Sequence, residues 1–353
     1  MFTGQVIAVG SFSPDNDLEY FLGARYLPEI QYEVKLDSTK LFTVLGAANL
    51  SATSFFHPFD ADQSDASIDP YRVWARYSTN RYEVRFGLQK IDFGSATMLR
   101  PMQWFSQIDP RDPLQLTNGV YAGLGRYYFP NNANIWLWAL YGNDAPRGLD
   151  SWPSDPHRVE YGGRVQYPVP KGEVALSYHN RQVEIEDPAT LQPVETTTEN
   201  RIGIDGKWDL GVGLWFEGAY IHNSDVLMRA ADQTFLTLGT DYTFGVGNGL
   251  SVLGEHMFSA FDSDPLSISE VYGISALSVT YPLTLLDNVS SMAYYDWTST
   301  NLTYFLSVEH QFRRFTGYAM GYYNPTTQSG VQENELITNL AGPGIRLMLV
   351  YNH

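Results

Sequence analysis

The chain has 353 residues, of which 39 are acidic and 22 basic, so its formal net charge at pH 7 is −17. This acidity excludes a general nucleic-acid binder, because such proteins need basic surface to neutralise phosphates. The absence of cysteine excludes disulfides and thiolate metal sites. The longest uninterrupted apolar run, Ile135 to Tyr141, is much shorter than the roughly 20 residues of a membrane-spanning helix.

The first residues lack the basic segment and cleavage site of a secretory signal. Met1 leads instead into a β-like run from Gln5 to Val9. Two interpretations are open at this point: a cytosolic protein, or a numbering that begins after a removed signal. The pattern of the remaining chain decides between them.

Apolar and polar residues alternate with a period of two along nearly the whole chain, which predicts β-strands. In residues 22–36 the even positions, such as Leu22 and Ile30, are apolar, while most odd positions, such as Arg25 and Glu33, are polar. The predicted strands are 4–13, 20–36, 40–55, 69–78, 81–94, 119–129, 133–143, 158–169, 173–185, 199–209, 212–223, 234–245, 249–261, 271–285, 289–298, 302–314, 316–324 and 343–352. That is about eighteen strands, or sixteen if the weak first or seventeenth segment merges with a neighbour.

The connections between these strands alternate in length, apart from a brief link at 299–301 where a long one is due. Short connections rich in turn-forming residues lie at 37–39, 78–80, 130–132, 171–172, 210–211, 246–248 and 287–288. Long ones cover 56–69, 95–118, 144–157, 186–198, 225–233, 263–270 and 325–342. This pattern is typical of a transmembrane antiparallel β-barrel, with short periplasmic turns and longer extracellular loops. A soluble all-β protein is the alternative.

Aromatic residues near strand ends are typical of the girdles at the two lipid interfaces. We expect the following to point outward: Tyr71, Tyr77, Tyr82, Tyr121, Tyr127, Trp136, Trp138, Tyr167, Tyr318 and Tyr322. Residues 1–353 then form a single barrel domain in a bacterial outer membrane, and a signal peptide is absent from this numbering. The expected partners are outer-membrane lipids, small polar solutes, and further copies of the chain or other envelope proteins, with no nucleic acid.

The polar face of each strand is expected to line the lumen. The predicted pore-lining residues are Arg25, Arg72, Arg76, Glu83, Arg85, Gln89, Arg158, Glu160, Arg164, Arg181 and Arg201. Further charged residues on this face are Lys207, Arg346, Glu29, Glu33, Asp205, Asp209, Glu217, Asp241, Glu255 and Glu309. Bases gather in the fourth, fifth and eighth to tenth strands and acids in the later half, which predicts a transverse field that orients charged solutes. Alternatively, the charges pair across neighbouring strands and only stiffen the wall.

The connection 95–118 is unusually apolar for a surface loop, so its apolar side chains must be buried away from water. It either folds into the pore as a constriction, or packs as a lid or against a partner protein. In the first case its polar and aromatic residues stand at the narrowest point and set selectivity. The predicted constriction residues are Arg100, Trp104, Asp109, Arg111 and Asp112.

Residues 82–129 contain three short motifs: Arg85-Phe86-Gly87-Leu88-Gln89, Asp92-Phe93-Gly94 and Asp109-Pro110-Arg111-Asp112-Pro113. Together these motifs resemble the alginate-export type of outer-membrane porin. The resemblance implies an eighteen-stranded barrel with an arginine-lined lumen that passes anionic sugars. The chain is short for that family and ends on His353 rather than on a terminal aromatic residue.

No set of residues points to catalysis, a cofactor or a metal. Ser177 and His179 share a strand face, but the sequence ties no aspartate or asparagine to them. The seven histidines are scattered and predict no zinc site. We therefore predict a porin for passive diffusion of small polar solutes, anions included, and no enzyme. The alternative is a non-conducting barrel that serves as a subunit or anchor of a larger outer-membrane complex.

Overall fold

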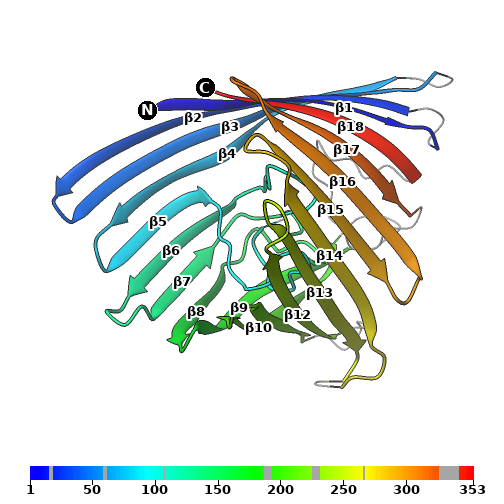
Figure 1. Ribbon diagram of the computed structural model, residues 1–353. Helices are drawn as coiled ribbons and strands as arrows, with labels where there is room; N and C mark the ends of the chain where they lie inside the picture. The colour runs from blue at the N-terminus through cyan, green and yellow to red at the C-terminus, as the bar shows by residue number, and fades with distance from the viewer. Residues whose placement is uncertain are drawn as a thin grey trace.

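The computed structural model describes residues 1–15, 19–58, 62–106, 108–150, 152–186, 193–224, 231–264, 267–325 and 342–353. These residues form eighteen β-strands in one sheet (Figure 1). In chain order they are β1 (Phe2–Ser13), β2 (Glu19–Asp37), β3 (Lys40–Phe56), β4 (Gln63–Ser78), β5 (Tyr82–Gln89), β6 (Val120–Tyr128), β7 (Asn134–Leu140), β8 (Glu160–Val169), β9 (Gly172–Glu186), β10 (Pro193–Asp209), β11 (Gly213–Asn223), β12 (Asp232–Phe244), β13 (Leu250–Asp262), β14 (Tyr272–Pro282), β15 (Asp287–Asp296), β16 (Asn301–Gln311), β17 (Phe315–Asn324) and β18 (Gly342–Asn352).

The sheet closes on itself and forms a barrel. Each strand pairs antiparallel with its neighbour in the chain, and β1 also pairs antiparallel with β18, from Gln5 opposite Asn352 to Phe12 opposite Ile345. Closure leaves no unpaired strand edge, which is a requirement for a sheet in lipid. The prediction of an all-β antiparallel barrel is confirmed, and the described residues give eighteen strands rather than sixteen.

The two ends of the barrel differ. Both termini and the short turns, such as those between β2 and β3 and between β16 and β17, lie at one end, which we call the turn end (Figure 1). Tight turns there use residues with positive φ, including Asn132 and Lys171. The opposite end, which we call the loop end, carries the longer connections. Parts of the predicted connections 56–69, 186–198, 225–233, 263–270 and 325–342 lie outside the described residues.

The outer surface of the barrel is apolar, as the alternation predicts. Leu22, Ile30, Ile345 and Leu347 are all more than half exposed, while their strand neighbours point inward. A continuous band of exposed apolar side chains is costly in water and suited to lipid. None of the described residues forms a helix long and apolar enough to cross a membrane.

Four of the expected girdle residues point inward instead. Trp138 and Tyr322 are buried in interior clusters, and Trp136 and Tyr318 pack against those clusters. The outward prediction for them was wrong because aromatic residues suit either face of a strand. Tyr82, Tyr121, Tyr127 and Tyr167 are exposed on the outer surface as expected.

Several strand boundaries also differ from the prediction, including the start of β4, the end of β5 and the starts of β8 and β10. β4 begins at Gln63 rather than residue 69, because its polar first residues continue the backbone pairing with β3. β8 begins at Glu160, so Arg158 precedes the strand with 69% of its side chain exposed, 3.8 Å from Asp155. Arg158 therefore lies on the loop end and not on the inner wall.

Candidate functional site

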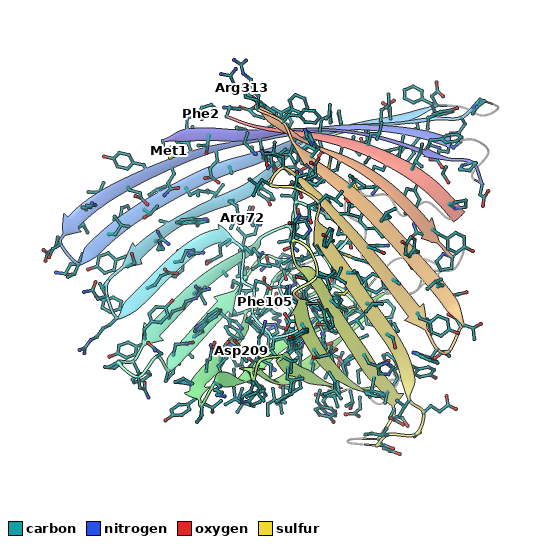
Figure 2. All side chains as sticks on the ribbon, in the orientation of Figure 1. Met1, Phe2, Arg72, Phe105, Asp209 and Arg313 are labelled. Carbon is teal, nitrogen blue, oxygen red and sulfur yellow. The ribbon has the colours of Figure 1, made fainter. Side chains whose placement is uncertain are left out.

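The long connection between β5 and β6, residues 90–119, lies inside the barrel, and we call it the inward segment (Figures 1 and 2). Its described residues, 90–106 and 108–119, contain no regular secondary structure. Its apolar residues contribute to two interior clusters that include side chains from walls far apart around the barrel. The apolar side of this connection is thus hidden in the lumen.

Glu255 of β13 holds the start of the inward segment by its backbone. The carboxylate accepts hydrogen bonds from the backbone N–H groups of Thr97 (2.6 Å), Met98 (2.9 Å) and Leu99 (2.6 Å). It also accepts one from Nε1 of Trp215, at 2.8 Å. These four hydrogen bonds make Glu255 a strong anchor for the segment, because hydrogen bonds to an ionised acceptor are about twice as strong as neutral ones.

Glu217 of β11 forms a second anchor beside the first. Its carboxylate accepts hydrogen bonds from the backbone N–H groups of Ala96 (2.8 Å) and Met102 (2.7 Å). The carboxylate also touches Gly94, where an added Cβ would lie 2.3 Å from Oε2 and the φ angle is +108°. Only glycine adopts this conformation at such a close approach without strain. The Thr237 hydroxyl of β12 donates to the carbonyl of Leu99 at 2.8 Å. Side chains of β11, β12 and β13 thus all bind the backbone of residues 96–102.

Aromatic rings fill the middle of the lumen on the β7–β9 side. Phe93 lies 5.4 Å from the Trp138 ring and 5.6 Å from the Trp104 ring, and Phe105 stands edge-on to Trp138 at 5.4 Å. Trp104 and Phe105 are each 2% exposed, and Figure 2 places Phe105 deep inside the barrel. Trp104, predicted as a constriction residue, is therefore a buried packing residue of the inward segment.

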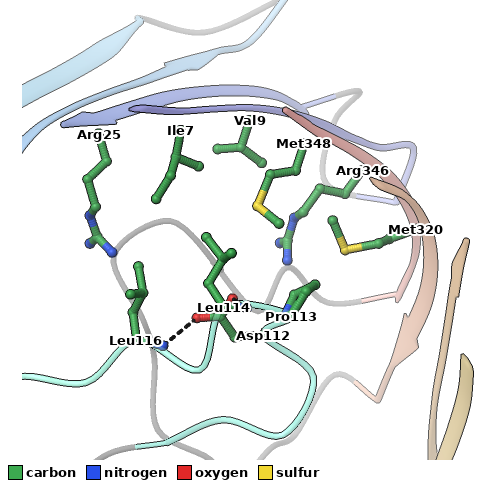
Figure 3. Close-up of a pocket in the computed structure, with 10 residues that line it drawn as sticks. All are labelled: Ile7, Val9, Arg25, Asp112, Pro113, Leu114, Leu116, Met320, Arg346 and Met348. Atoms are coloured by element: carbon green, nitrogen blue, oxygen red, sulfur yellow. Dashed lines mark hydrogen bonds between the residues drawn. The ribbon is translucent and has the colours of Figure 1, made fainter. Parts of the chain in front are cut away.

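The far end of the inward segment reaches the opposite wall. Leu114 and Leu116 pack against a cluster that contains Ile7 of β1 and Met320 of β17. A cavity of about 10 Å³ lies beside these residues, with Arg25 and Arg346 on the barrel wall above Asp112 (Figure 3). A cavity of this size holds one water molecule at most.

The charged residues of the far end are paired within the segment itself. Arg111 donates from Nη2 to Asp109 at 2.8 Å and from Nε at 3.0 Å. Asp112 accepts from the backbone N–H groups of Leu114 (2.9 Å) and Leu116 (3.1 Å). Burial raises the pKa of the Asp112 carboxyl, although these hydrogen bonds and the charge of Arg25 oppose the rise. That Asp109, Arg111 and Asp112 set selectivity remains a prediction.

Three other predicted residues also hold the segment or its flanking strands. Arg72 donates to the carbonyl of Thr117 at 2.6 Å, and Arg100 donates to Asp92 at 2.6 Å. Gln89 is fully buried and donates to the carbonyl of Ala122 at 2.8 Å. Each of the three side chains thus makes at least one hydrogen bond within the protein.

A second group of predicted residues, on β8–β10, forms a closed ionic network that we call the paired wall. Arg164 contacts Asp205 at 2.5 Å, and Arg181 contacts Asp150 and Glu199, each at 2.6 Å. Arg201 likewise contacts the carboxylates of Asp150 and Glu199. The Glu160 carboxylate contacts Arg147 and His179. All of these side chains are buried, so the wall is a compensated structural core.

A third group lies on β4–β7, and we call it the open cluster: Arg76, Arg85, Arg126, Glu83, Trp74 and Trp136. One carboxylate, Glu83, serves three guanidinium groups, at 3.0 Å from Arg85, 3.7 Å from Arg76 and 3.8 Å from Arg126. The Arg85 guanidinium lies 4.8 Å from the Trp74 ring centre, and that of Arg126 lies 3.8 Å from the Trp136 ring centre. The three arginine side chains are 15–24% exposed, so lumen water reaches them.

A recess of about 670 Å³ lies at the turn end, lined among others by Lys207, Glu173 and Asp241. Within the described residues, no group of three or more histidine, aspartate or glutamate side chains is placed to hold a metal ion.

Sequence reasoning missed several residues of these groups. Arg126, Trp74 and Trp136 complete the open cluster, and Arg147, Asp150 and Glu199 complete the paired wall. Arg126 falls on the same inner face as Val120, Ala122 and Leu124, which are apolar because they pack near the inward segment. The usual contrast between the two faces is therefore absent in β6.

A scan of the chain against protein-family models finds no match, and a search of curated protein sequences finds none. Solved structures do match. Pseudomonas aeruginosa OccK5 (OpdH) superposes with a TM-score of 0.59 at 10% identity, covering 99% of this chain and 97% of that one. Salmonella typhi OmpF, in complex with daunomycin, gives 0.54 at 11% identity, covering 100% and 97%. An anion-selective porin from Comamonas acidovorans gives 0.50 at 13% identity, covering 100% and 99%. The chain thus has the fold of the outer-membrane porin barrels.

Proposed function

We propose that this chain is an outer-membrane porin through which small polar solutes, anions included, diffuse passively. The observation that carries the proposal is a closed barrel, apolar outside and charged inside, whose lumen is narrowed by the inward segment. An apolar exterior requires lipid, and a charged interior with an inserted loop is the usual construction of a selective diffusion channel. The turn end then faces the periplasm and the loop end faces outward.

Within this proposal the wall residues have different roles. The open cluster and Lys207 carry positive charge that is accessible from the lumen and biases passage toward anions. Arg25, Arg72 and the charged residues of the inward segment shape the narrow region. Likeness to an anion-selective porin supports this bias, and the resemblance of residues 82–129 to alginate-export porins adds anionic sugars to the candidate solutes.

Conductance measurements test the proposal. The purified protein in a planar bilayer should give steady single-channel openings, and the reversal potential under a salt gradient should show anion preference. Reversing the charge of Arg76 and Arg85, as Arg76→Glu and Arg85→Glu, should shift that potential toward cations. Arg313→Glu, in the exposed turn between β16 and β17, is the matched control and should leave the potential near the wild-type value. Openings with unchanged selectivity would remove the open cluster from the pathway.

One observation favours a second candidate, a non-conducting barrel that acts as a subunit or anchor of an envelope complex. The inward segment packs against both interior clusters, so its apolar residues reach walls far apart around the lumen. Folded barrels that stay silent in the bilayer and purify with stable companions would favour this candidate. Conduction by the isolated protein would exclude it. Copies of the chain that associate with one another are compatible with either function.

A further inference from the structure

We propose that the open cluster is a binding subsite for dianionic oxyanion groups, such as a phosphate ester, a sulfate or a dicarboxylate. The inference rests on the proposed channel function and deepens it by naming a solute class. The cluster lies on the half of β4–β6 nearest the turn end, away from the inward segment's far tip.

The first support is a charge imbalance built into the strand register. Arg76 of β4 and Arg85 of β5 are direct cross-strand partners, and like charges in that position destabilise a sheet. Glu83 pairs in register with Arg126 of β6 and contacts all three arginines. Three positive charges and one negative charge leave a surplus of two. Glu33 does not offset it locally, because β3 separates it from Arg76.

The second support is the supply of hydrogen-bond donors. A guanidinium group carries five N–H donors. Among the described residues, the partners of these three groups are the Glu83 carboxylate, with the Thr43 hydroxyl at 3.4 Å from Arg76. The three guanidinium groups share these two partners, and their side chains are 15–24% exposed. Terminal N–H donors are therefore left for an oxyanion that approaches from the lumen.

The third support is preorganisation of the side chains. Arg76 and Arg85 both lie near the Trp74 ring, at 5.5 and 4.8 Å, and Arg126 lies on Trp136 at 3.8 Å. Stacking on aromatic faces fixes the planes of the guanidinium groups before a ligand arrives, which reduces the entropy lost on binding. The surplus of two charges matches a dianion better than a monoanion.

Calorimetric titration of the folded protein in detergent micelles tests the subsite without any membrane or current. Sulfate and succinate serve as dianionic probes, and acetate serves as the monoanion, all at constant ionic strength. Saturable binding of sulfate or succinate, at least about tenfold tighter than acetate, is expected. If only sulfate or only succinate saturates, the subsite belongs to phosphate- and sulfate-like groups or to dicarboxylates respectively.

Arg85→Gln and Arg126→Gln should each weaken dianion binding about tenfold or more, because a charge-assisted hydrogen bond is lost. Arg313→Gln removes the same charge from an exposed turn and should bind as the wild type does. Equal affinity for acetate, or binding that survives in both Arg85→Gln and Arg126→Gln, would overturn the proposal. Using two variants on different strands guards against one that fails to fold. If the folded protein gives no conductance in the bilayer but still binds sulfate in the titration, the proposed channel function is refuted and the proposed subsite is not.

Discussion

The paired wall and the open cluster line one lumen, yet their arginines are compensated in opposite ways. In the paired wall, Arg164, Arg181 and Arg201 are at most 4% exposed and each contacts a carboxylate within 2.6 Å. In the open cluster, three partly exposed arginines share Glu83. Charge on an inner strand face therefore has two different uses, structure in one wall and, as we propose, solute recognition in the other. Burial and the number of acidic partners distinguish them.

The largest expected difference between the two regions is in stability. Arg181→Gln removes one buried cationic partner from the carboxylates of Asp150 and Glu199. Because this leaves buried negative charge uncompensated, we expect the free energy of unfolding to fall by about 3–5 kcal/mol. Arg85→Gln removes a like-charge contact with Arg76 and should cost less than about 1 kcal/mol. Urea titration of the folded barrel in lipid vesicles, followed by gel mobility, measures both. Equal losses would erase the distinction between the regions.

A second prediction concerns the acidic side of the lumen, where Glu217 and Glu255 hold the inward segment. Each charge-assisted hydrogen bond lost in the double variant Glu217→Gln, Glu255→Gln weakens the anchor by about 1.5–3 kcal/mol. We expect a larger and noisier single-channel conductance than in the wild type.

The control for this variant is Glu309→Gln, which removes an acidic side chain of β16 rather than one of the two anchors. Its conductance should stay close to that of the wild type. If the double variant conducts like this control, the two carboxylates do not hold the segment in place.

The third and smallest effect is a pH dependence at Asp112. Because burial raises its pKa, this carboxyl takes up a proton at a pH above the ordinary value of an aspartate, about 3.9. A raised pKa means that the native state binds the proton more tightly than the unfolded chain does. Its contribution to stability therefore falls as the pH rises through that window. Loss of its charge near Arg25 should shift the reversal potential toward anions on mild acidification.

In Asp112→Asn the reversal potential should already be shifted at neutral pH and should change less on acidification. An unaltered acid response in this variant would assign the effect to other carboxyl groups. Reversal potentials recorded in matched salt gradients at two pH values provide the measurement.

The sequence predicts the strands well, because one face of each strand must meet lipid and alternation is enforced there. Prediction fails where both faces are apolar: the run from Ile135 to Tyr141 gives no contrast, so Trp136 and Trp138 were placed on the wrong side. It also fails where partners come from distant strands. Glu217 and Glu255 can be read as inward-facing acids, but their bonds to the backbone at 96–102 depend on how an irregular segment folds back.

Closure of β1 on β18 has a consequence for the order of assembly. The side-chain hydrogen bond between Gln5 and Asn352 joins residues 347 positions apart, so the seam needs the whole chain before it can form. Ala96 and Thr97 find their acceptors 121 and 158 positions further along. Since closing a shorter loop costs less entropy, we expect the inward segment to dock on β11–β13 while the sheet is still open. The barrel then closes around an inward segment that is already docked in the lumen.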